Sequence, residues 1–112
     1  MVKLIIMFKR LPGMTQQEFR DYRRDVHAPL LLAIPETNRF IRRFVVSYPI
    51  VVPNTPDPAY DVLVEGWFDN LDDLETFYSS DNFMQKVDPD HRNFIDLTSV
   101  VRFISEETVV IA

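Results

Sequence analysis

The order in which strand-like and helix-like segments follow one another restricts the fold of this chain more than any other feature. Residues 2–9 are apolar at both alternate sets of positions, which predicts a strand buried on two faces. Residues 39–52 and 60–68 are rich in aromatic and β-branched side chains and predict two more strands, joined by a proline-rich loop. A fourth strand is predicted at residues 97–104 and a short fifth one at residues 108–111.

Two helical segments interrupt these strands. Thr15 and Glu18 predict the start of the first, because their side chains can bond the free amides of its first turn. Pro29 lacks an amide hydrogen and crowds the preceding turn, so we expect the helix to kink or restart there. Asp69 or Asn70 can cap the second helix. Apolar positions with helical spacing are Phe19, Tyr22, Val26 and Leu30 in the first helix and Leu71, Leu74, Phe77 and Tyr78 in the second.

The resulting order, β-α-β-β-α-β, is typical of a ferredoxin-like α+β fold. In that fold a four-stranded antiparallel sheet carries two helices on one of its faces. The chain has 112 residues, which leaves room for one domain, and we place that domain at residues 1–112.

The sheet face that the helices leave open carries too many apolar side chains for a monomer in water. We therefore expect a homodimer in which two sheets enclose a barrel-like interior. Glu65 and Arg102 are predicted on the same face, where they can pair across the dimer interface or where Arg102 can bind an acidic ligand with both of its parallel N–H donors. The apolar side chains assigned to this face are Ile5, Met7, Leu63, Trp67, Val100 and Ile104.

Composition excludes several classes of function. The chain has no cysteine, which rules out disulfides, thiolate metal sites and thiol nucleophiles. Its glycines are Gly13 and Gly66, which cannot form a phosphate-binding or dinucleotide-binding loop. The net charge of −5 argues against a nucleic-acid partner, and no apolar run is long enough for a membrane span or a signal-peptide core. We expect a cytoplasmic protein that binds neither nucleic acid nor a membrane.

Several segments together resemble the EthD family. The resemblance covers nearly the whole chain, and its most specific part is the order strand, Pro-Gly, helix, His-Ala-Pro. The matching segments near the start are Lys3-Leu4-Ile5-Ile6-Met7-Phe8-Lys9-Arg10, Pro12-Gly13, Glu18-Phe19-Arg20-Asp21-Tyr22 and Val26-His27-Ala28-Pro29-Leu30. Those near the end are Asp90, Phe94-Ile95-Asp96 and Glu106-Glu107.

The resemblance implies a dimeric α+β barrel of ferredoxin-like subunits with an internal cavity. Related barrels act as muconolactone-type isomerases, polyketide-tailoring enzymes or quinol-forming monooxygenases, typically without a cofactor. By this likeness we expect a small hydrophobic cyclic or aromatic ligand and no cofactor. The reaction stays open among isomerisation, dehydration, decarboxylation and oxygenation. Two alternatives are a non-catalytic accessory protein that works beside a pathway oxygenase and a haem-handling barrel.

His27 is the first candidate for a catalytic residue. It lies at the margin of the apolar stripe of the first helix, close to Pro29. The freed carbonyl of Asp25 can hold one imidazole nitrogen, which leaves the other as a general base that faces a cavity. The alternative is a histidine that only satisfies the end of a helix.

Aromatic side chains are the candidates for the cavity wall. Trp67 offers a flat apolar surface and one N–H donor, and Tyr22 can donate a hydrogen bond near His27. Packing in the core or in the dimer interface is the alternative for both. The remaining predicted ligand contacts are Phe40, Phe83 and Phe94, together with the charged Arg102 and Glu65.

The segment Asp88-Pro89-Asp90-His91 has ligand-type residues, but its spacing does not bring three or four of them around one ion. We predict a turn and helix cap here, with His91 exposed and no metal bound.

Overall fold

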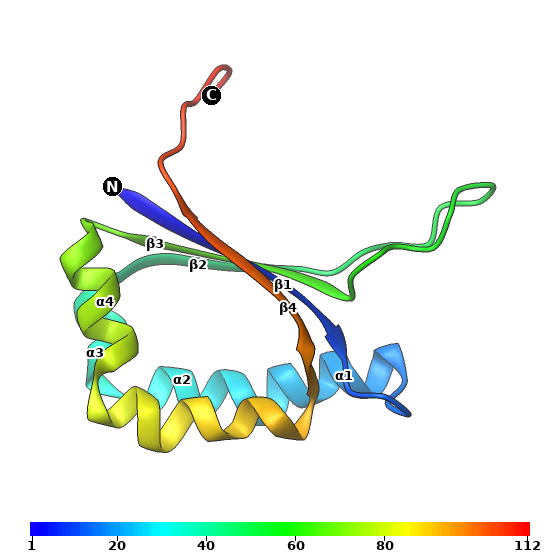
Figure 1. Ribbon diagram of the computed structural model, residues 1–112, viewed down its shortest axis with the longest axis horizontal. Helices are drawn as coiled ribbons and strands as arrows, with labels where there is room; N and C mark the ends of the chain where they lie inside the picture. Colours follow the sequence, from blue (N-terminus) through cyan, green and yellow to red (C-terminus); the bar gives the residue numbers. More distant parts are fainter.

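Four strands form an antiparallel sheet in the structure, a computed structural model that describes residues 1–112. β1 (Val2–Arg10) and β3 (Val62–Phe68) lie at the centre, with β2 (Ile41–Ser47) and β4 (Ile95–Ser105) at the edges, in the order β2-β3-β1-β4. The helices cover one face of the sheet and leave the other open (Figure 1). The predicted ferredoxin-like α+β fold is confirmed.

Each of the two long crossovers between strands is a broken helix. The first contains α1 (Gln16–Tyr22), the π-helical turn η1 (Arg23–His27), α2 (Ala28–Ala33) and α3 (Pro35–Phe40). The second contains α4 (Leu71–Ser79), the π-helical turn η2 (Phe83–Val87) and the 3-10 helix η3 (Asp88–Asn93). Both start with the predicted caps, since the Thr15 and Asn70 side chains accept amide hydrogens of the first turn.

Both π-helical turns end two residues before a proline. Ala28 donates its amide to the Arg23 carbonyl, and Asp88 donates its amide to the Phe83 carbonyl, which is one residue wider than an α-helical bond. Pro29 and Pro89 follow directly, at positions where a proline ring does not clash with an earlier carbonyl. The predicted interruption at Pro29 is therefore confirmed, and the second crossover repeats it.

Several boundaries differ from the predicted ones. β2 ends at Ser47 rather than at residue 52, because Pro49 cannot donate to the ladder. Residues 108–111 form no strand, since nothing pairs with them within a single chain. The connection from β2 to β3 projects away from the body, and the C-terminal residues leave the sheet on a separate course (Figure 1). No helix has the length and apolar content that a membrane crossing requires.

The hydrophobic core fills the space between sheet and helices. One cluster joins β1 and β3 to the C-terminal half of the first crossover and to the second crossover, and Phe40 packs against its edge. The other cluster lies under α1, and Tyr22 packs against it. The largest fully buried side chains are Phe19, Phe68, Phe77 and Phe94. Most of the phenylalanines are thus core residues.

The predicted face of β4 is wrong. Leu4 pairs with Ile104 and Ile6 pairs with Arg102, so Arg102 and Ile104 lie on the helix-covered face, and Val100 lines a cleft on that side. The open face instead receives Val101 and Phe103, opposite Met7 and Ile5. β4 is apolar at both alternate sets of positions, so its alternation carries no information about which set faces the helices.

The expected open-face residues of β1 and β3 do share one face. Ile5 lies opposite Glu65, Met7 opposite Leu63, and Lys3 opposite Trp67. Glu65 pairs with Lys3 at 2.8 Å, and Arg102 lies on the opposite face of the sheet, so the predicted pairing of Glu65 with Arg102 is wrong. The indole of Trp67 donates to Glu107 at 2.9 Å.

Candidate functional site

A cleft of about 410 Å³ lies between the sheet and the second crossover. The sheet contributes an apolar wall made of Ile6, Phe8, Ile95, Leu97 and Val100. The helical side contributes Tyr78, Phe83 and Pro89, together with the polar Asp88 and His91. Arg92 and Arg102 complete the lining. A concave, mostly apolar space with a few polar groups is the usual form of a small-molecule site.

His91 is the histidine that reaches this cleft. Its Nδ1 lies 3.0 Å from the Asp88 carbonyl oxygen and 3.3 Å from the Asp88 carboxylate, and both groups can only accept. Nδ1 therefore carries the hydrogen, and Nε2 is the free, basic nitrogen of the neutral ring. Burial lowers the pKa of His91 below its ordinary value. The side chain is 25% exposed, so the prediction of an exposed turn residue is corrected.

His27 lies directly behind His91. The centroids of the two rings are 4.6 Å apart, and only 7% of the His27 side chain is exposed. Its Nδ1 donates to Asp90 Oδ2 at 3.0 Å, which fixes the tautomer. Burial lowers the pKa of His27 to about 4, and the nearby charge of a protonated His91 acts in the same direction. His27 is therefore neutral near pH 7.

Asp90 is the centre of a hydrogen-bond network that holds His27. Tyr22 donates its hydroxyl to Asp90 Oδ1 at 2.5 Å, and Asn93 donates its amide to the same oxygen at 3.0 Å. Burial raises the pKa of Asp90, but the hydrogen bonds from Tyr22, Asn93 and His27 outweigh it and bring the pKa below its ordinary value. The network joins the first crossover to the second.

Replacing Asp90 with asparagine tests whether this network supports the site. The Asp90→Asn variant is expected to lose about 2 kcal/mol in its free energy of unfolding, because hydrogen bonds to a charged, shielded group are among the stronger ones. Denaturant unfolding at neutral pH measures the loss. Asp25→Asn is the matched control: its carboxylate is 59% exposed, so removing its pair with Arg24 is expected to change the stability far less. Equal effects in the two variants would contradict a structural role for the network.

Arg23 is buried beside the two histidines, although no carboxylate lies within ion-pair distance of it. Its Cζ atom lies 5.7 Å from the ring centroid of Phe8 and 5.6 Å from that of Phe94. Burial lowers the pKa of Arg23, yet a guanidinium remains charged. Burial is the main cause of the lowered pKa of both imidazoles, and the charge of Arg23 acts in the same direction to a smaller extent. Arg23 thus favours two neutral histidines.

The residues predicted for the site separate into two groups. Phe83 and Arg102 line the cleft, and Phe94 lies behind it with its ring centroid 4.8 Å from that of His27. Tyr22 and His27 belong to the Asp90 network. The other three are elsewhere: Phe40 is at the edge of the core, and Trp67 and Glu65 are on the open face.

His91 lines the candidate site, and the sequence patterns did not predict it there. A usable signal exists in the two crossovers, because both have a proline two residues after the end of a π-helical turn. π-helical turns are often found at functional sites. The second proline, Pro89, marks the short helix that presents both Asp90 and His91.

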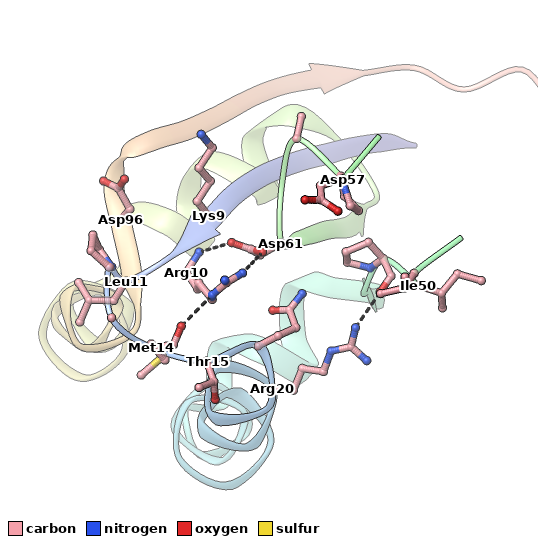
Figure 2. A pocket seen from close by; sticks show the side chains of 17 residues that line it. Lys9, Arg10, Leu11, Met14, Thr15, Arg20, Ile50, Asp57, Asp61 and Asp96 are labelled. Atoms are coloured by element: carbon pink, nitrogen blue, oxygen red, sulfur yellow. Dashed lines mark hydrogen bonds and ion pairs between the residues drawn. The ribbon is translucent and has the colours of Figure 1, made fainter. Parts of the chain in front are cut away.

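A larger hollow of about 1090 Å³ opens between the end of β1, the start of α1 and the connection before β3. Figure 2 shows that two arginines in its wall are engaged in hydrogen bonds within the protein. Arg10 binds the Asp61 carboxylate at 2.6 Å and the Met14 carbonyl at 2.7 Å, and Arg20 donates to the Pro49 carbonyl at 2.7 Å. The bonds to Asp61 and Pro49 attach both ends of the connection between β2 and β3 to the rest of the protein. The hollow has no imidazole in its wall, so the smaller cleft is the better candidate site.

A family model described as the EthD domain matches residues 11–98. The chain belongs to the EthD family. Among curated EthD relatives, the conidial pigment biosynthesis dehydratase EthD of Metarhizium robertsii is 31% identical over 104 residues, which span 83% of this chain and 72% of the relative. The dehydratase ustZ of Ustilaginoidea virens is 29% identical over 83% of this chain and 74% of its own length.

Solved structures agree with the EthD fold. An EthD-family protein from Bacillus halodurans superimposes with a TM-score of 0.73 at 24% identity, covering 96% of this chain and 99% of that one. A dimeric ferredoxin-like protein of unknown function from Bacteroides fragilis gives a TM-score of 0.68 at 19% identity, over 95% of both chains. At these identities the likeness shows the fold.

Proposed function

We propose that this EthD-family chain is a dehydratase that removes water from a small hydroxylated cyclic ketone bound in the cleft beside His91. The observation that carries the proposal is the neutral imidazole of His91, with its basic Nε2 free, on the wall of a mostly apolar cleft. The naming of the curated EthD relatives as dehydratases supports this choice among the possible reactions.

The chemistry needs one base that can return its proton. Nε2 of His91 removes a proton from the carbon next to the ketone, and the electron pair of the broken C–H bond moves onto the ketone oxygen. The resulting enolate expels the hydroxyl group from the next carbon, and that group takes the proton from His91 and leaves as water. A C=C bond replaces one C–H and one C–O bond. In a partly unsaturated ring the product tautomerises to an aromatic ring.

The surroundings of His91 suit this proton transfer. The Asp88 carboxylate, 3.3 Å from Nδ1, stabilises the imidazolium while it holds the proton. The apolar wall, including Phe8 and Phe83, excludes water from the enolate. The His27 ring packs against the His91 ring. His27 is itself fixed by its hydrogen bond to Asp90, the residue next to His91 in the chain.

A simple compound tests the proposed reaction. 3-Hydroxy-1-tetralone carries a hydroxyl group two carbons from its ketone, and loss of water followed by tautomerisation gives 1-naphthol, which fluoresces. We expect the purified protein to accelerate the formation of 1-naphthol well above the rate in buffer, without any added cofactor. A rate equal to that of buffer, or to that of heat-denatured protein, would argue against the dehydratase and in favour of a binding protein.

We also propose that two chains pair through their open sheet faces. Phe103 on this face is 51% exposed in the single chain. The apolar residues of the face are Ile5, Met7, Leu63, Trp67, Val101 and Phe103. Solved neighbours from Bacteroides fragilis and Thermobifida fusca are described as dimeric, which supports the pairing.

The Phe103→Glu variant should disrupt such a dimer. A carboxylate buried between two apolar sheets has no partner, so we expect the dimer dissociation constant to rise by about 100-fold or more. Analytical ultracentrifugation measures it. Ile50→Glu places the same charge on an apolar residue that is 76% exposed, in the projecting connection, and should leave the dimer intact. A wild-type monomer, or a Phe103→Glu variant as dimeric as the wild type, would contradict the proposed interface.

A further inference from the structure

Two arginines line the mostly apolar cleft, in a chain whose net charge is −5. Neither Arg92 nor Arg102 has a carboxylate within ion-pair distance, whereas Arg10, Arg24 and Arg42 all do. The one acidic residue in the cleft wall, Asp88, already accepts from His91. Two guanidinium groups against one carboxylate leave the cleft with an excess of positive charge.

Arg102 reaches the cleft from the sheet. It comes from β4, and its pairing with Ile6 directs it toward the helix-covered face. Its Cζ atom lies 5.9 Å from the ring centroid of Tyr78, another residue of the cleft wall. Burial raises the pKa of Tyr78 to about 12, so its hydroxyl keeps its hydrogen at neutral pH. The Arg102 guanidinium therefore lies over the aromatic ring of Tyr78.

We infer that the ligand of this cleft carries an anionic oxygen group, a carboxylate or an ionised phenol, which Arg102 binds together with Tyr78 and Arg92. A guanidinium presents parallel N–H donors that match the two oxygens of a carboxylate. The apolar wall made by Ile6, Leu97 and Val100 accepts the ring that carries this group. Charge attraction is stronger beside such a wall than in open water.

This inference rests on the cleft of the proposed function but not on dehydration. The ligand is an aromatic or partly unsaturated ring system with an acidic oxygen at its edge. Such a compound and a neutral ring of the same shape should differ in affinity only through the contact with the arginine. The cleft thus selects its substrate by charge as well as by apolar fit.

A matched pair of probes tests the inference. 2-Naphthoate and 2-naphthamide have the same two rings and nearly the same shape, but only the first is an anion at neutral pH. Isothermal titration calorimetry of the wild-type protein should give a dissociation constant for 2-naphthoate at least about tenfold lower than that for 2-naphthamide. Arg102→Gln should remove this preference and leave 2-naphthamide binding unchanged.

Arg39→Gln is the control variant. Arg39 is also exposed and lies over an aromatic ring, 5.1 Å from the centroid of Phe40, but it is not part of the cleft. The Arg39→Gln substitution removes the same charge from the protein but none from the cleft. This variant should therefore keep the full preference for 2-naphthoate.

Three results would overturn the inference. They are no binding of 2-naphthoate to the wild type, equal affinity for both probes, and an equal loss of both affinities in Arg102→Gln. Because neither probe can lose water, a positive result stands even if 3-hydroxy-1-tetralone is not converted. Conversely, if the protein converts 3-hydroxy-1-tetralone but binds 2-naphthamide more tightly than 2-naphthoate, the proposed function stands and the inference of an anionic ligand is wrong.

Discussion

The His91→Asn variant is expected to convert 3-hydroxy-1-tetralone about two to four orders of magnitude more slowly than the wild type, the range usual for a lost general base. Asparagine keeps a nitrogen donor near the Asp88 carbonyl, which His91 Nδ1 contacts at 3.0 Å, but it has no nitrogen that can accept a proton. The fold should persist, since His91 is only partly buried. Steady-state rates, with circular dichroism as the check on folding, measure the effect.

The His27→Asn variant separates the two histidines. The sequence pattern predicts His27 as the base, whereas in the structure His27 lies behind His91, with its Nδ1 bound to Asp90. Asparagine retains a donor for Asp90, so we expect His27→Asn to lose about tenfold in rate, far less than His91→Asn. If the larger loss followed from His27→Asn and the smaller one from His91→Asn, then His27 would be the base and our assignment would be wrong.

Stability against acid should depend strongly on His27. The pKa of His27 is lowered by burial to about 4, from an ordinary value of 6.5, so the unfolded chain takes up a proton at a higher pH than the folded chain. Stability is therefore complete above pH 6.5 and is lost as the pH falls from 6.5 toward 4. A difference of this size corresponds to about 3 kcal/mol in the free energy of unfolding.

The charged and titratable groups around His27 modify this dependence in known directions. His91, whose pKa is also lowered by burial, adds a loss of the same sign below its ordinary pKa. Asp90, whose pKa is lowered by its hydrogen bonds against the effect of burial, acts only at still lower pH. Arg23 keeps its charge throughout.

Denaturant unfolding at a series of pH values tests the dependence. In the wild type the free energy of unfolding should fall steadily from pH 6.5 to pH 4. In His27→Asn the fall should be smaller by about 3 kcal/mol, whatever the stability of the variant at neutral pH. A wild type with constant stability over this interval, or a variant with an unchanged slope, would show that His27 is not held neutral by burial.

Much of the fold could be predicted from local patterns. The element order, both helix caps and the interruption at Pro29 all depend on residues close in sequence, and all are confirmed. The face of β4 could not be predicted, because both of its alternate sets are apolar and only the pairing with β1 distinguishes them. The prediction of a short strand at residues 108–111 is wrong for a related reason, since a strand needs a partner strand and one chain does not supply it.

The site was harder to predict than the fold. His27 and Asp90 are 63 positions apart, and their contact depends on how the two crossovers pack side by side on the sheet. His91 follows a proline in a polar turn, a composition that is typical of exposed loops. Its position in the cleft arises only when the Phe83 and Phe94 rings on either side are buried in the core.

Hydrogen exchange at carbon tests the central claim, that His91 removes a proton next to a ketone, more directly than any complete reaction. 1-Tetralone has the ring and the ketone of the test substrate but no hydroxyl group to lose. In D2O, proton NMR should show the wild-type protein replacing the C2 hydrogens with deuterium well above the buffer rate, and His91→Asn doing so at the buffer rate. Exchange no faster than buffer in the wild type, or equally fast in both proteins, would contradict the claim.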